Sequence, residues 1–263
     1  MEKFDLIILG SGPGGYVTAI RASQLGLKTA IIEKESLGGV CLNWGCIPTK
    51  ALLKSAQVFD YIKHSEDYGI SVENYDKNFD NVINRSRKVA QTMSKGVNFL
   101  MKKNNIKIFE GFGKLSPNKT INITDQNGSE SKITGEKIII ATGARSRELP
   151  FLKKDGKRII GYREAMTLDK QPKDIVIVGS GAIGIEFAYF YNSMGTSVTI
   201  VEYMDRIVPV EDSEISKELE KSLKKKGINI LTSTEVEKAE INSSNTVDVT
   251  LKTSNGEKNI INT

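Results

Sequence analysis

Histidine is almost missing from this 263-residue sequence, because His64 is the only one. A zinc site built on several histidines is therefore excluded. A Ser-His-Asp triad would have to use His64, which follows an amphipathic helical pattern and has no nucleophile motif nearby. The sequence also has no apolar run close to the roughly 18 to 20 residues that a membrane-spanning helix needs. We expect His64 to lie on the surface, and we expect neither a metal site nor a membrane span.

The sequence has neither a strong charge of one sign nor a targeting segment. The 37 basic residues only slightly outnumber the 32 acidic ones, and they are scattered rather than gathered with aromatic residues. This pattern favours a solvated, lysine-rich surface over nucleic-acid binding. Met1 leads directly into an apolar strand pattern, without a basic leader or a small-residue cleavage site. We therefore expect a cytoplasmic protein whose mature form starts at Met1.

One unit of strand, glycine turn, helix and strand occurs twice. The first copy has a strand pattern at 4–9, a glycine turn at 10–15, a helical pattern at 14–25 and a strand at 28–33. The second copy starts 169 residues later, with its turn at 179–184, a helix to 194 and a strand at 197–202. This order is typical of the βαβ unit of dinucleotide-binding folds, and the separation predicts tandem domains rather than a solenoid.

The three glycines of each copy have separate tasks. The first allows the tight turn, the second lets a pyrophosphate approach the backbone, and the third lets helix and strand pack closely. The pyrophosphate then binds the free amides at the helix N-terminus.

A glutamate ends the second strand of each copy, 18 residues after the third glycine. These glutamates, Glu33 and Glu202, are expected to accept hydrogen bonds from ribose hydroxyls. Because a carboxylate repels a 2′-phosphate, Glu202 predicts NAD rather than NADP at the second site, with Arg206 as a minor complication. The alternative is a surface glutamate at the end of a strand.

The two cysteines, Cys41 and Cys46, lie five residues apart between glycines. Pro48 suits the first turn of a helix, which puts Cys46 at or near a helix N-terminus. Because a helix N-terminus stabilises a thiolate, Cys46 is the better thiolate candidate, whereas Cys41 is expected in a loop. Five residues of loop can bring the two sulfurs together. The alternative is a pair of inert thiols.

The remaining patterns complete two domains. Long helical patterns occur at 47–63 and 79–103, a strand-rich stretch comes next at 106–143, and Pro150 with residues 153–157 indicates a boundary. A helix is predicted at 213–226, and strands continue from it to residue 263. We predict a first domain at 1–148 and a second domain at 149–263.

Residues Gly38–Lys50 resemble the redox-disulfide signature GGxCxNxGCxPxK of the FAD-dependent pyridine nucleotide-disulfide oxidoreductases. The opening turn with Tyr16 and Val17, and the segment Cys46–Leu53, are most similar to the dihydrolipoyl dehydrogenase branch of that family. The similarity covers all 263 residues. It implies an α/β fold with two tandem Rossmann-like FAD- and NAD(P)-binding domains of three-layer ββα character.

The resemblance also implies which residues have a function. FAD belongs to the first copy, and its implied contacts are Gly10, Gly12, Gly14, Gly15, Glu33, Lys34, Gly39, Lys50, Gly113, Ala141, Thr142 and Gly143. NAD belongs to the second copy, and its implied contacts are Gly179, Gly181, Ala182, Ile183, Gly184, Glu202 and Val236. The implied catalytic residues are Cys41 and Cys46, which form a redox disulfide, and Lys50 and Glu186, which match an ion pair near the flavin.

The implied reaction is the oxidation of protein-bound dihydrolipoamide with reduction of NAD. A substrate thiolate attacks Cys41, and Cys46 is left as a thiolate against the flavin, which then passes a hydride to the nicotinamide. Lys50, as a buried and paired cation, stabilises negative charge on the reduced flavin. The implied partners are the lipoyl domains of 2-oxoacid dehydrogenase complexes or of the glycine cleavage system, and a second copy in a homodimer.

Members of this family are longer than 263 residues. They add a C-terminal dimerisation domain with a catalytic His-Glu pair, which is absent here, and His64 does not match that histidine. We expect this chain to be part of a longer enzyme. Two other functions stay open: another disulfide reductase of the glutathione- or mercuric-reductase type, and a non-catalytic nucleotide-binding fragment.

The resemblance predicts that Cys41 and Cys46 are joined by a reducible disulfide in the oxidised protein. Alkylation of the native, FAD-loaded protein before and after reduction, followed by mass spectrometry, should label both residues only after reduction. Labelling of both thiols without a reductant would contradict this prediction.

Overall fold

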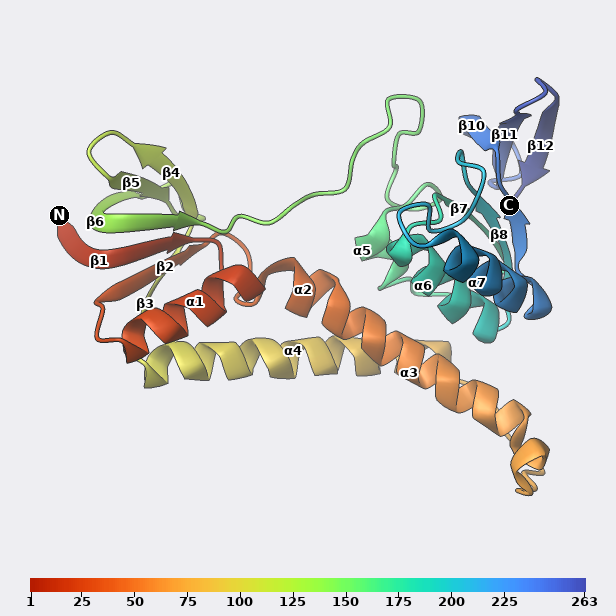
Figure 1. Ribbon diagram of the computed structural model, residues 1–263, viewed down its shortest axis with the longest axis horizontal. Coiled ribbons are helices and arrows are strands. Elements are labelled where there is room, and N and C mark those ends of the chain that lie inside the picture. Colours follow the sequence, from red (N-terminus) through yellow and green to blue (C-terminus); the bar gives the residue numbers. More distant parts are fainter. The chain divides into compact units, whose positions relative to one another are not determined.

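The computed structural model describes residues 1–263 and has a mixed α/β fold (Figure 1). Its helices are α1 (Pro13–Gln24), α2 (Gly39–Trp44), α3 (Cys46–Lys63), α4 (Phe79–Lys103), α5 (Tyr162–Ala165), α6 (Ala182–Ser193) and α7 (Ser213–Lys225), with a 3₁₀ helix, η1 (Ser65–Tyr68). Its strands are β1 (Glu2–Leu9), β2 (Thr29–Glu33), β3 (Lys107–Glu110), β4 (Phe112–Ser116), β5 (Thr120–Thr124), β6 (Glu130–Ile140), β7 (Asp174–Val178), β8 (Ser197–Val201), β9 (Asn229–Leu231), β10 (Thr234–Ile241), β11 (Val247–Thr253) and β12 (Lys258–Asn262). None of the helices is both long and apolar enough to cross a bilayer.

The chain forms two compact units. Unit 1 contains Met1–Pro48 and Arg85–Arg145, and unit 2 contains Thr49–Asn84 and Ser146–Thr263. The change of unit after Arg145 lies close to the expected boundary between residues 148 and 149. The stretch 49–84 was expected in the first domain but belongs to unit 2. It does so because Leu52 of α3 is fully buried in one hydrophobic cluster with residues of α6.

Unit 1 is built on a six-stranded sheet with the order β3-β2-β1-β6-β5-β4. The strands β3, β2, β1 and β6 pair in parallel, whereas β5 and β4 are antiparallel additions. Successive residues of a strand point to opposite faces. Leu6 and Ile8 of β1 therefore pack with residues of α1 and α4, whereas Ile7 and Leu9 pack with residues of β5. Helices α1 and α4 lie on one side of this sheet, and β4 and β5 lie towards the other (Figure 1).

Unit 2 repeats this layering with fewer strands. Its parallel sheet has the order β9-β8-β7, and a separate antiparallel sheet has the order β10-β11-β12. Ile200 of β8 packs with residues of α6 and α7, whereas the next residue, Val201, packs with residues of β10 and β11. Both units thus have helices on one face of a parallel sheet and antiparallel strands on the other, which confirms the predicted ββα layering.

Gly113 of β4 lies in a position where a side chain has no room. A Cβ atom there would be 2.4 Å from Cδ2 of Leu9 and 3.2 Å from Cγ2 of Ile32, and both of these side chains are buried. Gly113→Ala should therefore lower the free energy of unfolding by about 1–3 kcal/mol, as overpacking typically does. Urea denaturation of the variant and of the parent protein measures this difference.

Gly96 provides the matched control for this substitution. It lies on the exposed side of α4, and a Cβ atom there would meet nothing within 4 Å. Gly96→Ala should raise the free energy of unfolding by about 0.5–1 kcal/mol, because alanine is the better helix former. If both variants changed stability in the same direction, the packing argument for Gly113 would be wrong.

Candidate functional site

The first glycine turn joins β1 to α1 with almost no space between them. A Cβ atom on Gly15 would lie 1.9 Å from the carbonyl oxygen of Gly10, and one on Gly10 would lie 2.3 Å from that of Ala141. By contrast, a Cβ atom on Gly12 would meet nothing within 4 Å, and one on Gly14 would lie 3.9 Å from the Ala141 Cβ. Helix α1 starts without a side-chain cap. Its first residue, Pro13, has no amide hydrogen, and the amide of Gly15 donates to the carbonyl oxygen of Gly12 at 2.8 Å, so the amide of Gly14 is the one suited to an anion such as a pyrophosphate.

The second glycine turn, between β7 and α6, has the same construction. A Cβ atom on Gly184 would lie 2.2 Å from the carbonyl oxygen of Gly179, whose φ of +99° favours glycine. The space around Gly181 is open, and α6 also starts without a side-chain cap. Ala182 and Ile183 form the exposed start of α6. The second turn is therefore also suited to a pyrophosphate.

A pocket of about 520 Å³ opens beside the second turn, within unit 2. Its wall includes Ile175–Val178 of β7, and Gly179 and Gly181 of the turn. Arg147 and Arg158, from the segment before β7, also line it. An apolar wall with a few cations fits a ligand that has both rings and phosphates.

Each strand-end glutamate accepts hydrogen bonds from the serine that lies between the first and second glycines of its turn. Oε2 of Glu33 accepts hydrogen bonds from the amide and hydroxyl groups of Ser11, at 2.9 and 2.6 Å. Oε2 of Glu202 accepts the same two bonds from Ser180, at 2.7 and 2.6 Å. Both carboxylates therefore lie next to the start of a helix where a dinucleotide is predicted.

Glu202 is 7% exposed. Burial raises its pKa, but hydrogen bonds from the amide of Met204 and from the hydroxyl and amide of Ser180 lower it, and they prevail. The pKa of Glu202 therefore lies below its usual value. At neutral pH the second turn has a fixed negative charge next to it.

The other implied FAD contacts of unit 1 come directly after the ends of strands. Ala141 succeeds β6, and its amide donates to the carbonyl oxygen of Leu9 at 2.8 Å. Thr142 and Gly143 are exposed and continue from this point, and Lys34 is exposed directly after β2. These four residues are therefore accessible to a ligand.

Gly113 and Val236 have evident packing roles. Gly113 is glycine because Leu9 fills the space of a side chain. Val236 is 4% exposed and packs in the cluster between β8, β10 and β11. These observations explain both residues by packing alone.

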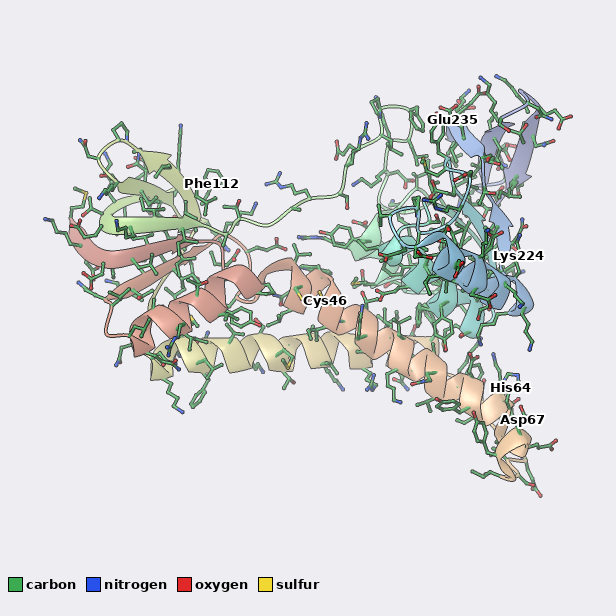
Figure 2. All side chains as sticks on the ribbon, in the orientation of Figure 1. Cys46, His64, Asp67, Phe112, Lys224 and Glu235 are labelled. Atoms are coloured by element: carbon green, nitrogen blue, oxygen red, sulfur yellow. The ribbon has the colours of Figure 1, made fainter.

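The cysteines lie in two consecutive helices rather than in a loop and a helix. Cys46 is the first residue of α3, as predicted, and its side chain is exposed (Figure 2). Cys41 was expected in a loop but lies half-buried in the short helix α2. The side chain of Asn43 donates to the carbonyl oxygens of Leu37 and Gly39, and these bonds stabilise the helical turn.

The start of α2 lies directly on the first glycine turn. A Cβ atom on Gly39 would be 2.7 Å from Cα of Gly12, and Gly39 has a φ of +59°. The amide of Gly38 donates to the carbonyl oxygen of Ser11 at 3.0 Å. The cysteine segment is therefore packed, backbone against backbone, on the segment suited to a pyrophosphate.

The sequence analysis missed two residues, Arg87 and Ser94, that fix this segment. Nη1 of Arg87 donates to the carbonyl oxygen of Asn43 at 2.7 Å, and its guanidinium lies 4.2 Å from the ring centre of Trp44. Burial lowers the pKa of Arg87, which remains a cation at neutral pH. Ser94 donates from its hydroxyl to the carbonyl oxygen of Leu37 at 2.8 Å. Their distance along the sequence, 44 and 57 residues, left no local signal for these bonds.

Lys50 and Glu186 form the ion pair that the resemblance implies. Nζ of Lys50 lies 2.5 Å from Oε1 of Glu186, and both residues belong to unit 2. The Lys50 side chain is 61% exposed, so the expected buried cation is wrong. An exposed ion pair of this kind adds little to the free energy of unfolding. Its effect is to hold the ammonium group of Lys50 in one position.

Asp60, ten residues further along α3, binds the other end of α6. Its carboxylate accepts hydrogen bonds from the hydroxyls of Tyr189 and Ser193 at 3.3 and 3.2 Å. Lys226 pairs with the same carboxylate at 3.0 Å. Helices α3 and α6 are thus joined at two places, and the orientation of Lys50 towards Glu186 results from this packing.

His64 lies on the surface at the end of α3, as predicted (Figure 2). Its Nδ1 is 2.8 Å from the carbonyl oxygen of Asp60, which also accepts from the backbone amide of His64 at 3.1 Å and so continues the helical turn. No group of three or more His, Cys, Asp or Glu side chains is arranged to hold a metal ion.

Known proteins resemble this chain over nearly its whole length. The family model described as pyridine nucleotide-disulphide oxidoreductase matches residues 4–262. The dihydrolipoyl dehydrogenase of Rhizobium etli is 51% identical over 254 residues, which are 91% of this chain and 53% of that protein. The dihydrolipoyl dehydrogenase of Bacillus subtilis is 47% identical over 242 residues, which are 89% of this chain and 51% of that protein.

Two solved structures have the same fold. LpdA from Mycobacterium tuberculosis superposes with a TM-score of 0.88 at 25% identity, covering 99% of this chain and 57% of that one. The HOCl-induced flavoprotein disulfide reductase RclA from Escherichia coli superposes with a TM-score of 0.83 at 26% identity, covering 99% of this chain and 55% of that one. The chain spans about half the length of the curated relatives it matches. The family model matches residues 4–262, and this range includes the two glycine turns and the cysteine segment. The chain therefore belongs to the pyridine nucleotide-disulphide oxidoreductase family.

Proposed function

We propose that this chain forms the FAD-binding and NAD-binding parts of a dihydrolipoyl dehydrogenase, which oxidises protein-bound dihydrolipoamide and reduces NAD. The observation that supports this most directly is the contact of the cysteine segment with the first glycine turn, at Gly39 and Gly12. It puts the two thiols next to the predicted dinucleotide. The relatives named dihydrolipoyl dehydrogenase, at 51% and 47% identity, favour this substrate within the family.

Membership of this family implies FAD and NAD(H) as cofactors, and the residues present fit both. Each uncapped helix start offers amides to a pyrophosphate, and each has an adjacent carboxylate for a ribose. We assign FAD to the first turn, because the cysteine segment packs there, and NAD to the second. When bound, FAD would supply the two-electron redox chemistry that links oxidation of a dithiol to reduction of NAD.

In this proposal the cysteines exchange disulfides with the substrate. A substrate thiolate attacks Sγ of Cys41, a new S–S bond forms, and the Cys41–Cys46 bond breaks, so that Cys46 leaves as a thiolate. The second substrate thiolate then displaces Cys41 and completes the substrate disulfide. The position of Cys46 as the first residue of α3 supports its role, because the amides of a helix start stabilise negative charge.

Lys50 supports the same step by its place in the helix. It comes about one turn of α3 after Cys46, and its ammonium is held by Glu186. We propose that Lys50 supplies positive charge near the reduced flavin, and that Glu186 keeps its long side chain in one orientation. This role needs a fixed position rather than a buried cation.

The proposal also implies the partners and the location. They are the lipoyl domains of 2-oxoacid dehydrogenase complexes or of the glycine cleavage system, a second copy in a homodimer, and the cytoplasm. A reductase for another disulfide is the main alternative. Comparing turnover of dihydrolipoamide with turnover of glutathione in the FAD-loaded protein distinguishes the two, and the proposal fails if glutathione is the better substrate.

The two cysteines should respond differently to substitution. Cys41→Ser should leave Cys46 as a thiolate that gives a long-wavelength charge-transfer absorption with FAD, without any reductant, whereas Cys46→Ser should abolish this band. Both variants should lose lipoamide turnover. Absorption spectra and steady-state assays of the FAD-loaded variants measure these effects.

Diaphorase activity from NADH to an artificial acceptor is the control for intact flavin in both variants, because that reaction needs no cysteine. If the long-wavelength band depended on Cys41 instead, the two roles would have to be exchanged.

Glu202 should make the protein prefer NAD to NADP by at least about tenfold in catalytic efficiency. Its ionised carboxylate would meet a 2′-phosphate with like charge, and like charges about 4 Å apart repel by roughly 4 kcal/mol at an effective dielectric constant near 20. Glu202→Ala should narrow the preference for NAD over NADP. Glu33→Ala, the corresponding substitution in the first copy, should leave this preference unchanged. Equal catalytic efficiency with NAD and NADP in the parent protein would remove this assignment.

A further inference from the structure

The residue between the first and second glycines of both turns is serine, and the requirements for glycine do not explain this choice. The glycine motif requires glycine at three positions and places no requirement on the residue between the first and second of them. Yet Ser11 and Ser180, which we call the turn serines, are both fully buried. Each gives two hydrogen bonds, from its amide and its hydroxyl, to one oxygen of the glutamate 22 residues later.

The turn serines also bind the segment that comes after each glutamate. The carbonyl oxygen of Ser11 accepts from the amide of Gly38, at the start of the cysteine segment, at 3.0 Å. The carbonyl oxygen of Ser180 accepts from the amide of Val208 at 3.1 Å. Val208 is buried and has a φ of +38°, an unfavourable conformation for a β-branched residue. Such a backbone persists only where neighbouring bonds hold it.

We infer that the turn serines are positioning residues for nucleotide binding. Ser180 orients the Glu202 carboxylate towards the ribose of NAD, and Ser11 orients Glu33 towards the ribose of FAD. The inference rests on the proposed assignment of FAD to the first turn and NAD to the second. Their hydroxyls act through the carboxylates and do not contact the nucleotide themselves.

Each carboxylate is held by three hydrogen bonds. The amide and the hydroxyl of the turn serine bind one oxygen, and a backbone amide, of Glu35 in the first copy and of Met204 in the second, binds the other. Alanine keeps the two amide bonds but removes the hydroxyl bond, so the carboxylate is held less firmly in its orientation. Hydrogen bonds to charged groups are stronger than those between neutral groups, so this loss should be measurable.

The test measures nucleotide binding rather than turnover. The dissociation constant for NAD is measured by calorimetric titration of the FAD-loaded protein, and FAD retention is measured as the rate of FAD release on dilution. Ser180→Ala should weaken NAD binding about fivefold to tenfold and leave FAD release within about twofold. Ser11→Ala should show the reverse pattern. Ser243→Ala, an exposed serine in unit 2, is the control and should change neither quantity.

A double-mutant cycle separates positioning from a general loss of structure. If Ser180 acts through Glu202, Ser180→Ala should cost nothing further in a Glu202→Ala background. The inference would be overturned if Ser180→Ala weakened NAD binding equally with and without Glu202, or if Ser180→Ala left the dissociation constant for NAD unchanged. Either result would leave the proposed function intact. Failure of the parent protein to bind NAD at all would overturn both.

Discussion

The close approach of strand and helix at each glycine turn determines much of this structure. At Gly15 and Gly184 a single Cβ atom would lie 1.9 and 2.2 Å from the carbonyl oxygen of the first glycine in its turn. With glycine in both places, the helix starts directly at the end of the strand, uncapped and open to an anion. The carboxylates, the turn serines and the segments after them all lie around this start, in both units.

The two copies differ in the segment after their second strand. In unit 1 the chain turns into α2 and α3 and brings two thiols to the first glycine turn, with Gly39 against Gly12. In unit 2 the corresponding segment contains Val208 in a left-handed conformation, and the neighbouring surface opens into a pocket of about 520 Å³. Under the function proposed above, the repeated βαβ element has an electron-accepting role in the first copy. In the second copy it binds a ligand that exchanges.

Local sequence patterns were enough to predict most of the fold and part of the site. Strict spacing and strong periodicity predicted both βαβ units, and Pro48 placed the start of α3 correctly at Cys46. The features that the sequence could not show depend on contacts between distant residues. The bond from Arg87 to Asn43 and the burial of Leu52 against α6 result from packing that no local window contains.

The central claim is that one chain holds two different dinucleotides at once, each at its own glycine turn. Counting bound nucleotides tests it most directly: equilibrium dialysis of the FAD-loaded protein against NAD, followed by heat release and quantification of both. The account predicts one FAD and one NAD per chain, with FAD remaining when NAD is saturating. Displacement of FAD by NAD, or a total of one nucleotide per chain, would contradict it.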